Sequence, residues 1–180
     1  SLRGLSSLQR LVATANQISG AIDILADDLL VSGHVTPAGW SQPLAVRWPN
    51  VEHVLLGENA LSGTLSAAFG ALSELRSLHL AHNPSVGGTL PAAYANGAAL
   101  EDLQLSNTQV SGSLPSSLGG LTSLQHLLID RARLSGTIPS ELGAAADLAT
   151  LSLEHNRLSG HIPLALCGNC STAVDLTLGP

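Results

Sequence analysis

A glycine recurs at nearly constant spacing through most of this 180-residue chain. It stands in the phrases "LSGTLS", "VGGTLP", "VSGSLP", "LSGTIP" and "LSGHIP", and successive copies lie 24 or 25 residues apart. The glycines concerned are Gly63, Gly88, Gly112, Gly136 and Gly160. Self-similarity at this period predicts a solenoid, in which one unit cannot bury its apolar edge alone and neighbouring units stack to form a continuous core.

Each unit repeats the same order of apolar and turn residues. Leu151 and Leu153 alternate with polar residues, which predicts a short strand with one buried face. Asn156 then turns the chain and can bond free backbone groups of the neighbouring coil. After the glycine, Ile162 is expected to return to the core, and Pro139 has the fixed φ that starts a short outer helical turn. The aromatic residues share apolar positions of the repeat and are predicted to fill the core: Trp40, Trp48, Phe69 and Tyr94.

These phrases resemble the plant-specific class of leucine-rich repeat proteins, whose units read L-x-x-L-x-x-L-x-L-x-x-N-x-L-x-G-x-I-P. The resemblance covers most of the chain. It implies an α/β repeat fold, a right-handed leucine-rich-repeat solenoid of about six to seven coils. Short parallel β-strands would line its concave face, and short 3-10 or helical turns would form its convex face.

The repeats predict three regions: irregular N-terminal repeats at 1–35, regular plant-type repeats at 36–163, and a C-terminal repeat or cap at 164–180. The interval from Gly20 to Gly33 is only 13 residues, whereas a coil of this kind needs about 20. Either residues are missing there, or the first segment is not stacked like the rest. Since neither end shows a cap, we expect the chain to belong to something longer or to be covered by partners at its ends.

The asparagine position of the repeat is not uniform. Its series is Asn16, Leu29, Asn59, Asn83, Thr108, Ala132 and Asn156. A threonine can keep one hydrogen bond to the backbone, whereas leucine and alanine cannot. We therefore expect the turns at Leu29 and Ala132 to be supported in another way.

The solvent-facing residues of the strands and of the turns after them form columns about 5 Å apart across the concave face. This face is the predicted protein-binding site, although it carries few of the Trp, Tyr and Arg residues that dominate binding hot spots. The predicted partner-binding residues are Leu55, Glu58, His79, His82, Gln104, Asn107, Leu128, Asp130, Arg131, Glu154 and His155.

Histidines and carboxylates on this face raise the questions of metal binding, pH sensing and catalysis. No histidine pair has the spacing of a metal site on one helix, although a pH-dependent contact remains open because histidine titrates near neutrality. Asp130 and Glu154 are neighbouring carboxylates, and with Arg131 they are expected to form a solvated ion network rather than an acid–base pair. We therefore predict a protein that is not an enzyme, with no catalytic residue, cofactor or metal.

The only cysteines lie in "CGNC", at Cys167 and Cys170. A small disulfide or two free thiols is the favoured interpretation, and a thiol-exchange pair is the alternative. A redox motif normally lies at a strand-to-helix turn of a βαβ unit, and a zinc site needs more ligands. Asn169 opens the sequon Asn-Cys-Ser, which is a glycosylation site if the chain enters the secretory pathway.

Composition narrows the classes of partner. The net charge is −6 and no lysine occurs, which disfavours nucleic acid and anionic membrane surfaces. The apolar runs are far shorter than the ~20 residues that span a bilayer. We predict a noncatalytic protein–protein interaction module, and the resemblance implies the extracellular or cell-surface region of a larger protein. The alternative is a structural subunit of a larger assembly that uses its ends and convex face.

Overall fold

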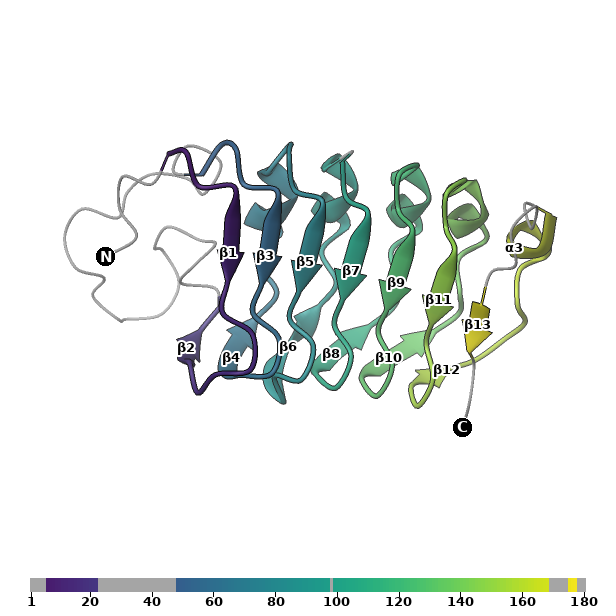
Figure 1. Cartoon of the computed structure of the whole chain (residues 1–180). Helices are drawn as coiled ribbons and strands as arrows, with labels where there is room; N and C mark the ends of the chain where they lie inside the picture. Colours follow the sequence, from purple (N-terminus) through teal and green to yellow (C-terminus); the bar gives the residue numbers. More distant parts are fainter. Residues whose placement is uncertain (1–5, 23–47, 98, 169–174, 178–180) are drawn as a thin grey trace.

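One parallel sheet forms the concave side of the molecule. The computed structural model describes residues 6–22, 48–97, 99–168 and 175–177, with side chains through residue 166. Seven strands follow one another in sequence order, one from each coil (Figure 1). They are β1 (Arg10–Val12), β3 (His53–Leu55), β5 (Ser77–His79), β7 (Asp102–Gln104), β9 (His126–Leu128), β11 (Thr150–Ser152) and β13 (Asp175–Thr177). In this sheet, equivalent residues of successive repeats lie side by side, as Val54, Leu78 and Leu103 do.

A second parallel sheet follows the turn after each of these strands. It contains β2 (Ser19–Ala21), β4 (Ala60–Thr64), β6 (Ser85–Thr89), β8 (Gln109–Gly112), β10 (Arg133–Gly136) and β12 (Arg157–Leu158). Between the central strands, its register is displaced along the chain relative to the repeat. Ser62 lies opposite Ser85 rather than opposite its repeat equivalent Gly87. Equivalent positions therefore form slanted rows on this sheet.

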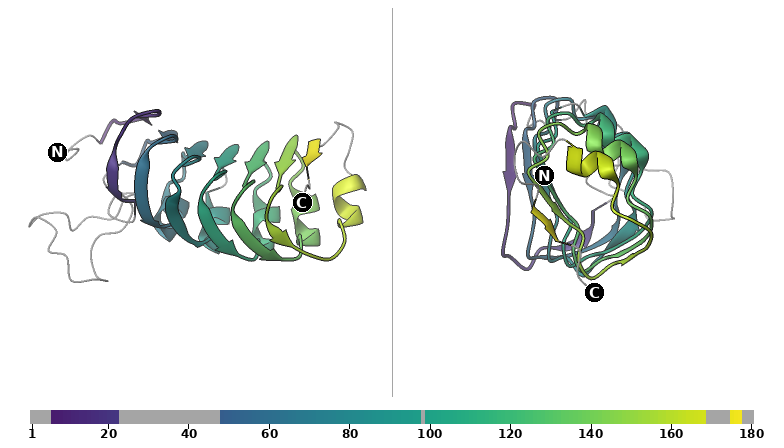
Figure 2. Two further views of the ribbon diagram at one scale, coloured as in Figure 1. Left: turned by 90° about the horizontal axis from the view of Figure 1, so that it is seen from below. Right: turned by 90° about the vertical axis from the view of Figure 1, so that its right-hand side faces the viewer.

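Short helical turns close the coils on the convex side (Figure 2). They are the 3-10 helices η1 (Ala67–Ala71), η2 (Ala92–Asn96), η3 (Ser116–Gly120) and η4 (Ser140–Ala144), followed by the α-helix α3 (Leu164–Gly168). A proline with φ between −67° and −70° precedes η2, η3 and η4. Before η1, Ser66 takes this place, and its Oγ accepts a hydrogen bond from the Ala68 N–H. The predicted leucine-rich-repeat solenoid is confirmed.

The core is a ladder of leucines enclosed by the two sheets and the helical turns. In the first sheet, the central residue of each strand from β3 to β11 is fully buried, and so are Leu118 and Leu142 of the outer turns. Phe69, Tyr94 and Trp48 are only 2–3% exposed, which confirms their prediction as core residues; Trp40 lies outside the described residues. Among the described residues, no helix has the length and apolarity needed to cross a membrane.

Asparagine side chains join successive coils. The Asn83 Oδ1 accepts from the backbone N–H of Leu61, and its Nδ2 donates to the carbonyls of Leu56 in the preceding coil and Leu80 in its own coil. Thr108 keeps one such bond, to the Leu105 carbonyl at 2.7 Å, as predicted.

The first described segment departs from one expectation. β1 pairs directly with β3, and β2 pairs with β4, so residues 10–21 form a coil stacked like the others. The alternative of an unstacked first segment is wrong for these residues, because both strands pair with the next coil and Leu11 and Ala13 pack against the same core. Gly33 and Leu29 lie outside the described residues. The region boundaries at 35 and 163 stay predictions.

Ile162 does not return to the core. It is 44% exposed, whereas its equivalents Leu90, Leu114 and Ile138 are 4–7% exposed. Those three residues precede a further described coil with both an inner strand and a second-sheet strand. β12 is the last strand of the second sheet within the described part of the chain, which leaves the Ile162 side chain at an edge.

Candidate ligand-binding face

The first sheet brings the predicted binding residues of the strands into one column. Leu55 lies beside His79, His79 beside Gln104, and Gln104 beside Leu128. All four are partly buried, since neighbouring strands cover their stems while their ends reach solvent. The concave surface therefore presents these side chains as one row running across the strands.

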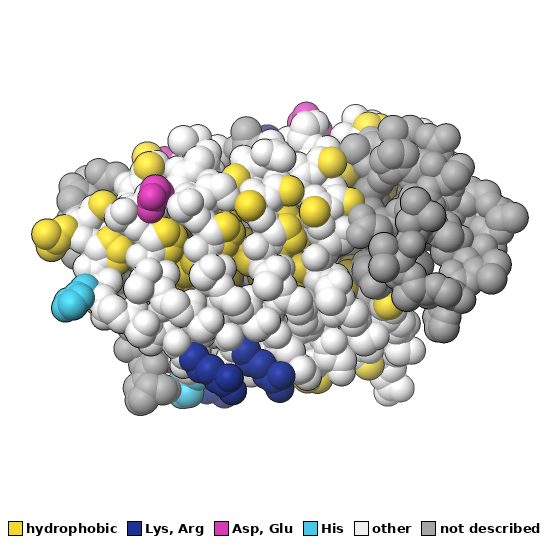
Figure 3. Space-filling model, turned by 180° about the vertical axis from the view of Figure 1, so that it is seen from behind, with side chains coloured by type: hydrophobic (Ala, Val, Ile, Leu, Met, Phe, Trp, Pro, Cys, Tyr) yellow, Lys and Arg dark blue, Asp and Glu magenta, His cyan; other side chains and the backbone are white. Residues whose placement is uncertain are grey.

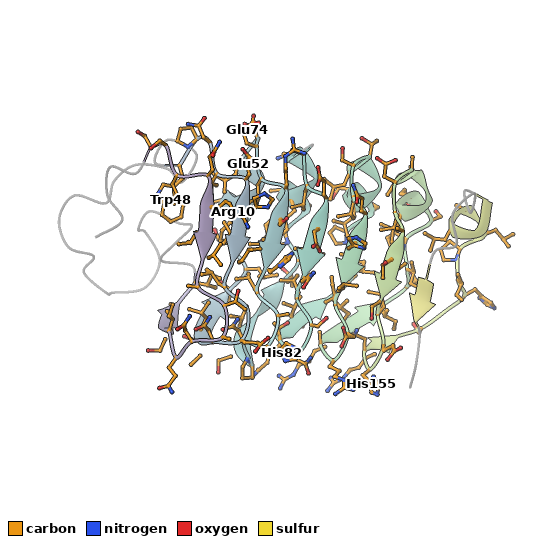
Figure 4. All side chains as sticks on the ribbon, in the orientation of Figure 1. Arg10, Trp48, Glu52, Glu74, His82 and His155 are labelled. Atoms are coloured by element: carbon orange, nitrogen blue, oxygen red, sulfur yellow. The ribbon has the colours of Figure 1, made fainter. Side chains whose placement is uncertain are left out.

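A second set of predicted residues occupies the turn that leaves this sheet. The residue before the asparagine position has a left-handed backbone in every described coil, with φ between 51° and 58°. These residues are Ala15, Glu58, His82, Asn107, Arg131 and His155. Figure 4 shows His82 and His155 along the same edge of the solenoid. Together, these turns form a row at the rim of the concave face.

In the coils that keep the asparagine, its side chain supports this backbone conformation. A left-handed non-glycine residue costs about 1 kcal/mol or more. Asn156 Nδ2 donates to the carbonyls of Leu153 and Glu154, at 3.0 and 3.2 Å, and so closes the turn that holds His155. Sequence reasoning placed the asparagine correctly but did not foresee the left-handed residue before it.

Sequence reasoning missed a further column at the first position of each strand. It contains Arg10, His53, Ser77, Asp102, His126 and Thr150. Because side chains two residues apart share a face of a strand, these residues face the same side as the column that includes His79. The alternation that identified the strands would have been enough to find them.

The missed column supplies a partner for a predicted binding residue of the face. His79 Nε2 lies 2.8 Å from the Asp102 carboxylate, which also accepts from Gln104 Nε2 at 3.2 Å. Burial raises the Asp102 pKa, but the hydrogen bond and the positive charge of His79 outweigh it and lower the pKa below its ordinary value. Asp102 is therefore ionised at neutral pH.

Two other histidines contact hydroxyls of the next coil. The Nδ1 atoms of His53 and His126 lie 3.0 Å from Ser77 Oγ and 3.1 Å from Thr150 Oγ1. These contacts fix the rings along the sheet. Ser77 lies in the same strand as His79, and His126 lies beside Asp102 in the strand register, so these contacts continue the polar row along the sheet.

The expected ion network around Arg131 does not form. Asp130 accepts a hydrogen bond from Ser106 Oγ in the adjacent coil, and Glu154 lies 3.7 Å from His155 Nδ1. Within the described residues, no carboxylate lies at ion-pair distance from Arg131. The carboxylates have closer polar neighbours along the sheet, while the Arg131 side chain leaves from the turn.

The face is an open surface rather than an enclosed site. One cavity, of about 10 Å³, lies in the apolar core beside Tyr94, and another, of about 150 Å³, lies at the C-terminal edge beside Ile138 and His161. No group of three or more potential metal ligands occurs among the described residues. The predicted disulfide and glycosylation residues Cys170 and Asn169 lie outside the described residues, as does the Cys167 side chain.

Comparisons with known proteins agree with this geometry. The Leucine Rich Repeat family model matches residues 99–121 and 147–169. The structure of the plant peptide hormone receptor RGFR1 in complex with RGF2 is similar over 97% of this chain, with 30% identity and a TM-score of 0.80. The chain spans only 25% of that receptor chain.

Two shorter relatives cover two thirds of the chain. The ectodomain of the receptor kinase SOBIR1 from Arabidopsis thaliana is 30% identical over 67% of this chain and 68% of its own, with a TM-score of 0.60. A plant ice-binding protein is 34% identical over 66% of this chain and 38% of its own, with a TM-score of 0.61.

Proposed function

Since this chain belongs to the leucine-rich repeat family, we propose that it is the noncatalytic protein-binding region of a larger receptor-like protein at the cell surface or outside the cell. The observation that carries the proposal is the match over 97% of the chain to the structure of a plant peptide hormone receptor in complex with RGF2. The row of side chains on the first sheet, with polar residues between Leu55 and Leu128, is consistent with binding.

The concave face suits an extended partner segment that crosses the strands. Strands of one sheet lie about 4.8 Å apart, and an extended chain rises about 3.3 Å per residue. A partner segment would therefore need about three residues to advance by two strands of the sheet. The row from Leu55 to Leu128 offers one apolar side chain at each end and polar side chains between them. Such a segment would make few contacts in each coil and draw its affinity from several coils.

Charge on this face favours a segment with cationic side chains. Asp102 is ionised because of its lowered pKa, and Asp130 and Glu154 follow it in the next two coils. Arg76, the residue before β5, already forms ion pairs with Glu101 and Glu52 and so does not offset these carboxylates. Complementary charge of this kind accelerates association and fixes orientation more than it adds affinity.

The test is a binding measurement on synthetic extended peptides. A library of basic 10- to 14-residue peptides would be screened against the purified chain, and the best binder would be titrated against Leu128→Arg. This change fills the row with a bulky cation, so we expect a loss of affinity of at least about tenfold. The matched control is Ser140→Arg, which adds the same charge at an exposed position of the convex η4. Equal affinities of the two variants, or no binding peptide, would refute concave-face recognition.

The second sheet supports a second candidate function, ice binding. Its strands from β2 to β8 contain no charged residue, and their solvent-facing side chains are mainly hydroxyls. These are Ser19, Ser62, Thr64, Ser85, Thr89 and Ser111. Rows of hydroxyl and methyl groups at repeat spacing can hold ordered water, and the relative that is a plant ice-binding protein favours this interpretation.

Ice growth in the presence of the chain separates the two candidates. If the second sheet binds ice, the wild type will slow ice recrystallisation, and Thr89→Lys will abolish the effect because a hydrated ammonium interrupts the hydroxyl row. Leu128→Arg on the concave face will leave it unchanged. Recrystallisation at the rate of an inert protein of equal mass would exclude ice binding.

A further inference from the structure

Exposed arginines gather at the C-terminal end of the second sheet. Arg131, Arg133 and Arg157 are all exposed, and they lie in two consecutive coils. Figure 3 shows basic side chains side by side along the lower edge of the face seen from behind. This concentration contrasts with the uncharged strands β2 to β8 of the same sheet.

Strand register brings two of these arginines to one face with a serine between them. Arg133 and Ser135 are two residues apart in β10 and therefore point to the same side. Ser135 lies directly opposite Arg157 of β12. From the strand spacing and rise, the Cα atoms of Arg133 and Arg157 are about 8 Å apart, so two long guanidinium side chains can reach one anionic group.

No described carboxylate neutralises this group. The strands of the second sheet contain neither Asp nor Glu. No ion pair within the described part of the chain involves Arg133 or Arg157. Neighbouring like charges repel each other, and an added anion would relieve that repulsion.

The backbone below the arginines is held by hydrogen bonds from the next coil. Asn156 Oδ1 accepts from the Leu134 N–H at 2.9 Å, and Ser159 N–H donates to the Gly136 carbonyl at 2.8 Å. Both ends of β10 are thus tied to the coil that carries Arg157. The spacing of the backbone positions that carry the two arginines is therefore set by the fold before any ligand binds.

We propose that Arg133, Ser135 and Arg157 form a binding site for the anionic groups of an acidic polysaccharide. Arginine donates two parallel hydrogen bonds to a carboxylate or a sulfate, and the exposed Ser135 hydroxyl supplies a further donor. A polymer lying along the sheet would place its anionic group at the arginines and its hydroxyls against the hydroxyl-bearing strands β4 to β8. This site is separate from the concave face of the proposed function.

The surroundings favour a polysaccharide over other polyanions. No large apolar side chain of the second-sheet strands is exposed; the exposed ones in the described chain are Val12, Ile18, Ile162 and Leu164. An acidic protein segment would lack the apolar anchors that hot spots need. A nucleic acid needs a longer array of cationic side chains along its phosphates than the arginines of these two coils supply.

The test measures binding to defined polymers by calorimetry. The probes are polygalacturonate and dextran sulfate, with uncharged dextran as the control for hydroxyl contacts alone. We expect micromolar to millimolar binding of at least one charged polymer that weakens as salt is raised. Binding of polygalacturonate alone would identify the carboxylate as the source of the anionic group, and binding of dextran sulfate alone would identify the sulfate.

Three single variants localise the site. Arg133→Gln and Arg157→Gln are each expected to weaken binding at least about fivefold, while Arg10→Gln changes the net charge equally on the other sheet and leaves it unchanged. Unfolding midpoints confirm that all three variants fold. Equal weakening by Arg10→Gln, no binding of either charged polymer, or tighter binding of polyglutamate or single-stranded DNA would overturn the proposal.

Discussion

Two adjacent glycines in η3 provide a direct test of how closely the coils pack. Gly119 is buried, and a Cβ built on it would lie 2.0 Å from the carbonyl oxygen of Glu141 in the next coil. Gly120 is exposed, and its Cβ would meet no atom within 4 Å. Neither glycine has a positive φ, so an alanine at either site tests space rather than backbone strain.

We expect Gly119→Ala to lower the free energy of unfolding by about 3 kcal/mol, the upper part of the range for overpacking. To bring the new contact to 3.0 Å, η3 and η4 would have to separate by about 1 Å. The obstacle is backbone, which cannot rotate away as a flexible side chain can. Gly120→Ala should be neutral or stabilise by about 0.5 kcal/mol, because alanine lowers the entropy of the unfolded chain.

Urea unfolding followed by circular dichroism, supported by thermal melts, measures both effects. For a chain of this size, 3 kcal/mol corresponds to a fall in Tm of about 6–12 °C. The m-values must also be compared, since repeat proteins can unfold coil by coil. The equivalent position of η2 is Ala95, so some coil junctions accept a methyl group. Equal midpoints for the two variants would show that η3 and η4 separate at little cost and would refute the packing argument.

Three further predictions concern the turns and the concave face. Asn83→Ala should cost about 2–3 kcal/mol in urea unfolding, because the buried side chain bonds the backbone of two coils; a loss below 0.5 kcal/mol would contradict this. Ala132→Asn should stabilise by about 1 kcal/mol, since it restores the turn support that Arg131 lacks; a lower midpoint would show that the site has no room. Asp102, whose pKa is lowered, contributes stability that is present above about pH 4 and is lost as pH falls through its folded pKa. Asp102→Asn should therefore flatten that part of the stability–pH curve, and an unchanged curve would refute the assignment.

The repeat pattern was sufficient to predict the coil but not the contacts between coils. Residue type and phase within one unit fixed the strands, the proline-started turns and the burial of Phe69 and Tyr94. The closeness of Gly119 to Glu141 depends on the distance between two convex turns, which no single unit encodes. Ile162 shows the same limit, because its burial depends on a neighbour and not on its place in the motif.

The candidate site was predicted by position and only partly by chemistry. Sequence columns placed His79 and Gln104 on the concave face, but their partner Asp102 lay in a column that had not been considered. The pairing arises because strand register puts Gln104 beside His79, and Asp102 shares a face with Gln104 two residues earlier. The displaced register of the second sheet likewise puts Ser135 beside Arg157, which alignment of the repeats alone would not do.

Most substitutions on the exposed columns should affect binding without affecting the fold, because the leucine ladder and the asparagine turns hold the coil together. The His79–Asp102 pair is an exception, since it joins two coils through side chains of the binding face. A cationic ligand group that engages Asp102 would compete with His79 for the same carboxylate. Ligand affinity and the stability of the β5–β7 junction are therefore coupled there, and His79→Gln should alter both. Leu128→Arg, by contrast, should alter affinity more than stability, since Leu128 is only partly buried and its hydrogen bond to the Leu105 N–H is made by its backbone carbonyl.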